Sequence, residues 1–168
     1  MSSTIAALPP TLQHYSDSIC VQGMGLAKRV FGRAELAKMA SVTADSLSVA
    51  CYSGRHIRDV SQARGVRLID LLDAWGLGAL PRSQCKQLVF AVGARDGYIC
   101  LFTWHELYNT PGGQTAMLLV EQAGEAFPAS AGGLQLISLD DLRLGPRQAL
   151  GVDRLEIGQW EPAARLQD

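Results

Sequence analysis

The sequence has no excess of charge of either sign. Its 168 residues include 15 Lys and Arg against 16 Asp and Glu, which gives a formal net charge of −1. A nucleic-acid-binding surface needs surplus basic side chains to neutralise phosphates, so a nucleic-acid partner is not expected. The charged fraction of 18% is low and the hydrophobic fraction of 48% is ordinary, which argues against disorder and predicts one compact domain.

Long hydrophobic runs are also missing. A membrane-spanning helix needs roughly 18 to 20 apolar residues, and Lys, Arg, Asp or Gly interrupts every shorter run. The opening residues, MSSTIAALPP, carry no positive charge and are too short for the hydrophobic part of a signal peptide. The sequence therefore predicts a soluble protein without a membrane span, cytoplasmic as the chain stands or periplasmic if an export signal was removed.

Several motifs with defined chemistry do not occur. The four cysteines form no C-x-x-C pair, and the three histidines lack the spacing of metal ligands on one helix face. A structural zinc site is therefore not expected, and scattered cysteines favour free thiols over a disulfide framework. No Gly-x-Gly-x-x-Gly, phosphate-loop lysine or Gly-x-Ser-x-Gly motif is present, which argues against nucleotide binding by those routes and against a serine hydrolase.

The hydrophobic periodicity predicts more strands than helices. Helices are predicted over 33–39 and 66–75, the second closed by Gly76, and a hairpin over 87–103 around Asp96-Gly97. Further strands are predicted near 19–21 and 30–31 and over 47–51, 115–122, 134–139 and 154–160. Because hairpins dominate and strand-helix-strand alternation is absent, the predicted fold class is α+β, with mainly antiparallel mixed sheets and a few short helices.

These elements define a simple domain organisation. We predict an extended N-terminal leader over 1–17, a single domain over 18–160 and a C-terminal tail over 161–168.

The segment that begins at Cys51 combines a thiol with basic side chains, Arg55, Arg58 and Arg64. Neighbouring guanidinium groups lower the pKa of a thiol, and a thiolate attacks electrophiles or binds soft metals. A cysteine at the end of an apolar strand is more often a buried hydrophobic residue, so the residues alone leave both interpretations open. His56 is near enough in sequence to serve as a base, but so short a spacing rarely aligns two such groups.

Four motifs follow one another along the chain: VACYSGR at 49–55, GVRLIDLL at 65–72, DGY at 96–98 and E-x-x-G-x-x-x-P at 121–128. In order and spacing they resemble the oxidoreductase molybdopterin-binding domain of the sulfite oxidase family, over about residues 19–157. The resemblance implies a sulfite-oxidase-type molybdopterin-binding fold and a molybdenum–molybdopterin cofactor.

The resemblance also implies roles for four residues. Cys51 stands where the thiolate ligand of the metal would be, and Arg55 would bind the cofactor or an oxyanion substrate. Tyr98 occupies the position of a substrate-side tyrosine, so Tyr98 and Arg55 are the candidate catalytic residues. Arg147, in a Gly-x-Arg segment, would bind the pterin phosphate. The candidate cofactor-binding residues are thus Cys51, Arg55 and Arg147.

Two departures from the family pattern leave two functions open. Ala131 stands at a histidine position, and Leu150 stands where the pattern has a phosphate-binding lysine. The first function is a small molybdopterin oxidoreductase that performs oxygen-atom transfer or related two-electron chemistry on a small anionic or carbonyl-like molecule and uses a separate electron-transfer protein. The second is a cofactor-free binding module that uses Arg55, Arg58 and Arg147 to hold a small anion or a partner peptide.

Overall fold

A computed structural model describes residues 13–161 of the chain. Strands dominate, most of them pair antiparallel, and the helices are short. The predicted α+β class is thus confirmed. Within residues 13–161, no helix is long and apolar enough to cross a membrane.

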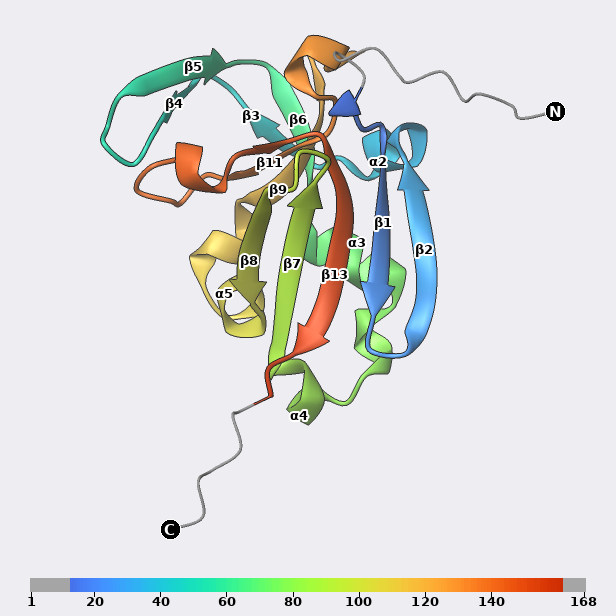
Figure 1. The fold of residues 1–168 in the computed structure, drawn as a ribbon. Coiled ribbons are helices and arrows are strands. Elements are labelled where there is room, and N and C mark those ends of the chain that lie inside the picture. The colour runs from blue at the N-terminus through green and yellow to red at the C-terminus, as the bar shows by residue number, and fades with distance from the viewer. Residues whose placement is uncertain (1–12, 162–168) are drawn as a thin grey trace, which may run out of the picture.

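The first sheet has five strands in the order β2-β1-β13-β7-β8 (Figure 1). All neighbours in it pair antiparallel except β1 and β13, which pair parallel. The first and last strands of this sheet in the sequence therefore lie side by side. Its strands are β1 (Ser18–Gly23), β2 (Leu26–Gly32), β7 (Leu88–Ala94), β8 (Ile99–Thr103) and β13 (Val152–Gln159).

The second sheet has the order β12-β11-β9-β6-β3, and the short β10 pairs with β9. Its neighbours all pair antiparallel. Its strands are β3 (Val42–Ala44), β6 (Ala63–Arg67), β9 (Ala116–Gln122), β10 (Glu125–Ala126), β11 (Gln135–Ser138) and β12 (Ala149–Leu150).

Among residues 13–161 the helices are few and short. The predicted bounds of α2 are confirmed, and Gly76 ends α3 with a φ of +109°, a left-handed conformation typical of a helix C-cap. The helices are α2 (Arg33–Met39), α3 (Leu68–Trp75), α4 (Arg82–Cys85) and α5 (Trp104–Tyr108), and the 3₁₀ turns are η1 (Leu77–Ala79), η2 (Pro111–Gln114), η3 (Ala129–Ala131) and η4 (Gly145–Arg147).

The start of α3 corrects the sequence prediction, which began this helix at Val66. Val66 belongs to β6, where it pairs with Leu118 of β9. Gly65 explains the difference, because an added Cβ there would lie 2.8 Å from the Leu118 carbonyl oxygen. This close approach of two backbones holds the segment in the sheet until Leu68, where the helix begins.

The main core lies between the two sheets and around α3. Its large side chains are fully buried and come from every layer: Phe31, Phe90 and Phe102 from the first sheet, Leu118 and Leu136 from the second, and Leu71 and Leu72 from α3. Burial of this apolar surface is the dominant stabilising contribution to the fold.

Strand β9 is buried on both of its faces. Leu118 faces the main core, whereas Met117 and Leu119 face a second cluster. The β4 (Leu47–Ala50) and β5 (His56–Val60) hairpin supplies part of this second cluster through Val49 and Val60. The outer face of the second sheet therefore positions this hairpin, which projects from the body of the molecule in Figure 1.

The predicted leader and tail fall mainly outside the described residues, which omit 1–12 and 162–168. Near the start of the described chain, the Ser16 N–H donates to the Gly132 carbonyl at 3.0 Å, and the Leu134 N–H donates to the Ser16 carbonyl at 2.9 Å. Residue 16 is therefore bonded to the domain.

The pairing of β7 with β8 confirms the predicted hairpin around Asp96-Gly97. Gly97 has a φ of +90°, and Asp96 is not among the residues with positive φ. The Gly97 N–H donates to the Ala94 carbonyl at 3.0 Å, and Asp96 Oδ1 accepts from the Tyr98 N–H at 2.9 Å. The hydrogen bond to Asp96 thus fixes the backbone of Tyr98 directly before the start of β8.

We predict that Gly97→Val lowers the free energy of unfolding by about 1–3 kcal/mol, because a β-branched residue resists positive φ. Gly158→Val in β13 is the matched control, since an added Cβ meets nothing within 4 Å at either position and Gly158 has no positive φ. The control should change stability by no more than about 0.5 kcal/mol. Urea denaturation measures both, and equal effects would disprove backbone strain at Gly97.

Candidate functional site

Cys51 lies in the turn that joins β4 to β5. Its backbone N–H donates to the Arg55 carbonyl at 2.9 Å, and the Gly54 N–H donates to the Cys51 carbonyl at 2.8 Å. Gly54 has a φ of +86°, which glycine adopts without steric penalty. Cys51 is half-buried, and its Sγ lies 2.9 Å from Ser53 Oγ.

The pKa of the Cys51 thiol lies below its ordinary value. The largest cause is the side-chain hydrogen bond with Ser53, which the desolvation of the thiol partly opposes. Backbone hydrogen bonds at Ser53 and Arg55 and the charge of Arg55 lower the pKa further. The turn therefore favours the thiolate, the form of cysteine that reacts with electrophiles and binds soft metals.

Of the basic residues that follow Cys51, Arg55 is exposed and acts on the thiol through its charge. Arg58 has a different environment on β5, where its guanidinium donates to Gln135 Oε1 at 2.7 Å. Partial burial lowers the pKa of Arg58. Arg58 thus ties the hairpin to β11 instead of joining Arg55 beside the thiol.

Arg64 and His56 also have partners of their own. Arg64, on β6, pairs with Glu121 of β9 at 2.5 Å. His56 Nε2 lies 2.9 Å from Asp59 Oδ1 on the exposed side of the hairpin. The arrangement considered from the sequence, in which His56 serves Cys51 as a base, is therefore not formed.

Tyr98 and the Cys51 turn both contact η4. The Tyr98 hydroxyl donates to the Pro146 carbonyl, and partial burial raises its pKa. An added Cβ on Gly145 would lie 2.5 Å from the Ala50 carbonyl oxygen, so η4 also lies against the residue before Cys51. The structure thus brings Cys51 and Tyr98 into one region through η4.

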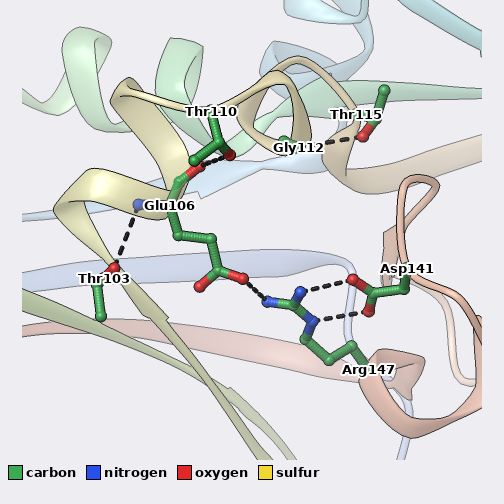
Figure 2. Close-up of polar contacts among 7 residues, drawn as sticks. All are labelled: Thr103, Glu106, Thr110, Gly112, Thr115, Asp141 and Arg147. Carbon is green, nitrogen blue, oxygen red and sulfur yellow. Dashed lines mark hydrogen bonds and ion pairs between the residues drawn. The ribbon is translucent and has the colours of Figure 1, made fainter.

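The Arg147 side chain extends from η4 to α5 (Figure 2). Its Nε and Nη2 donate to the two carboxylate oxygens of Asp141 at 2.7 and 2.5 Å, and its Nη1 donates to Glu106. The guanidinium carbon lies 4.5 Å from the centre of the Phe102 ring. Hydrogen bonds to Asp141 and then to Glu106 raise the pKa of Arg147 against the effect of desolvation, and two carboxylates compensate its charge.

A cavity of about 330 Å³ opens beside this ion pair. It lies between α5, η2 and the segment that runs from the end of β11 to η4. The lining combines apolar and charged residues: Phe102, Leu107 and Pro111 are apolar, Glu106, Asp140 and Asp141 are acidic, and Arg147 is basic.

Glu106 and Asp141 are not among the site residues predicted from the sequence. One local signal for Glu106 was available, because Thr103-x-x-Glu106 is a capping pattern at the start of a helix. In the structure the Glu106 N–H donates to Thr103 Oγ1 at 3.2 Å, as Figure 2 shows. The pairing of Glu106 with a residue 41 positions away has no such local signal.

No protein-family model matches this sequence, and no curated protein matches it.

We predict that Cys51 is the first of the four cysteines to be alkylated in the native protein near neutral pH. Cys85 and Cys100 are buried, and burial raises the pKa of Cys100 to about 11. Iodoacetamide in limiting amount, followed by peptide mass spectrometry, measures the order. Ser53→Ala should move the pH midpoint of Cys51 alkylation upward, because the variant loses the main stabiliser of the thiolate. Modification of Cys51 only after unfolding would contradict the prediction.

Arg147→Ala should lower the free energy of unfolding by about 2–3 kcal/mol, because it leaves two carboxylates without their common partner. Arg143→Ala is the control, since Arg143 is exposed and, within residues 13–161, donates only to the neighbouring Leu142 carbonyl. Its effect should stay within about 0.5 kcal/mol. Chemical denaturation measures both variants. If the Arg147→Ala and Arg143→Ala variants were equally stable, the two carboxylates would hold Arg147 only weakly. Arg147 would then be available to bind another anion.

Proposed function

We propose that this chain is a small-molecule-binding domain with a sulfite-oxidase-type fold that works without the molybdenum–molybdopterin cofactor. The observation that carries this proposal is the pairing of Arg147 with Asp141 and Glu106. The ligand site is the cavity beside that ion pair.

The sulfite-oxidase-type fold is supported by where the four resembling motifs lie. The first forms the β4–β5 turn, the second runs from β6 into α3, the third forms the β7–β8 turn and the fourth runs from β9 past β10. These positions are all junctions between elements of a strand-dominated α+β domain. Motifs at such junctions set turn and close-packing geometry as well as chemistry.

The phosphate end of the cofactor does not fit this chain. A phosphate needs cationic donors that no other anion has already compensated. Of the two positions that the family pattern provides, Leu150 has no charge and Arg147 already donates to two carboxylates. A phosphate at Arg147 would have to displace Asp141 and Glu106 and would then lie beside both negative charges.

The contacts of these arginines also argue against the second function predicted from the sequence, in which Arg55, Arg58 and Arg147 hold a small anion. Arg58 donates to Gln135 and Arg147 donates to Asp141, so of the three arginines in that hypothesis Arg55 is the one at the protein surface. An isolated exposed cation binds a small anion weakly in water. The acidic cavity is therefore the better candidate for ligand binding.

The oxidoreductase is the second candidate, and one observation favours it. Cys51 has the lowered pKa that a metal-binding thiolate needs, and η4 links its turn to Tyr98. These residues suit a thiolate ligand with a nearby phenol. They do not supply the phosphate contacts that hold the rest of the cofactor.

Metal and pterin analysis tests the proposal. We expect the full chain, purified from a host that makes the molybdenum cofactor, to contain only trace molybdenum and pterin, equal to the content of Cys51→Ser. Near-stoichiometric molybdenum and pterin in the native protein, lost in Cys51→Ser, would overturn the proposal in favour of the oxidoreductase. A molybdenum protein purified in parallel from the same host shows that cofactor was available.

A further inference from the structure

The cavity beside Arg147 carries an excess of negative charge. Three carboxylates and one guanidinium line it, which leaves a formal charge of −2. Arg147 holds both oxygens of Asp141 but only Oε1 of Glu106. Within residues 13–161, Glu106 Oε2 and the exposed Asp140 carboxylate accept no hydrogen bond, so both are available to a ligand.

A buried hydroxyl also lines this cavity. Ser138, the last residue of β11, is only 2% exposed. Its side chain makes no hydrogen bond within the part of the chain that the structure describes. Because strand side chains alternate, Ser138 lies on the same face as Leu136, which belongs to the main core with Phe102 and Leu107 of the cavity wall. The Ser138 hydroxyl can therefore accept a hydrogen bond from a ligand or water in the cavity.

The size and the donor set point to an organic cation instead of a metal ion. The volume of about 330 Å³ is at the lower end of the roughly 300–1,000 Å³ typical of small-molecule sites. Among residues 13–161, no group of three or more His, Cys, Asp or Glu is placed to hold a metal ion. The apolar wall of Leu107 and Pro111 suits methylene groups.

We infer that this cavity binds a small aliphatic amine in its ammonium form. An ammonium group has three N–H donors, and the cavity offers three acceptors without partners, on Glu106, Asp140 and Ser138. The carbon chain lies against Leu107 and Pro111. Arg147 has a positioning role, because it holds the Asp141 and Glu106 carboxylates at the cavity. This inference rests on the proposed function, since it names the ligand class of the same site.

Isothermal titration of the full chain with 1,4-diaminobutane tests the inference. Its four-carbon counterparts, 1,4-butanediol and succinate, are the neutral and anionic controls. We expect the diamine alone to bind, and to bind more weakly as salt screens the carboxylates. Asp140→Asn should weaken diamine binding about tenfold through loss of one charged acceptor, and Ser138→Ala should weaken it as well.

The control variant is Glu125→Gln on β10, which removes an exposed carboxylate outside the cavity lining and should leave binding unchanged. Because Asp140 is exposed, its variant should keep the native melting temperature, so a loss of affinity reports on the ligand. Absent diamine binding, equal binding of the diol or succinate, or displacement of the diamine by Mg²⁺ would overturn the inference. If the titration fails in one of these ways but the protein contains no molybdenum, the amine inference is wrong and the proposed function is unaffected. The proposed function is refuted by a separate measurement, the finding of stoichiometric molybdenum.

Discussion

The burial of β9 on both faces is the constraint on which the rest of the structure depends. Leu118 faces the main core while Met117 and Leu119 face the opposite side, so both faces of this strand need an apolar cover. The β4–β5 hairpin supplies part of the outer cover through Val49 and Val60. Hydrophobic burial thereby places the Cys51 turn, although that turn itself contains mostly polar residues.

The segment from the end of β11 to η4 connects this hairpin with α5. At η4 the backbone of Gly145 lies against Ala50, and the Pro146 carbonyl accepts a hydrogen bond from Tyr98. On the other side Arg147 reaches Glu106 of α5. A single short segment therefore separates the thiol region from the acidic cavity. The two sides differ in charge: the thiol lies beside the positive Arg55, and the cavity has surplus carboxylates.

Local chemistry explains which features were predictable from sequence. The bounds of α2, the Gly76 cap and the β7–β8 hairpin depend on residues within a few positions of one another, and the predictions for them are confirmed. The start of α3 was predicted two residues early, because the approach of Gly65 to β9 is a contact between distant segments. The parallel pairing of β1 with β13 has no local signal for the same reason.

For the candidate site, the sequence by itself determined that a thiol lies next to a basic residue at a strand end, since Cys51, Ser53 and Arg55 belong to one turn. It did not determine the partners of the other charged residues. The sequence predicted Arg147 as a phosphate-binding residue, whereas in the structure Arg147 pairs with Glu106 and Asp141. Only the tertiary structure decided this, because the charge available to a ligand depends on the groups that chain topology places within hydrogen-bonding distance, whatever their separation in sequence.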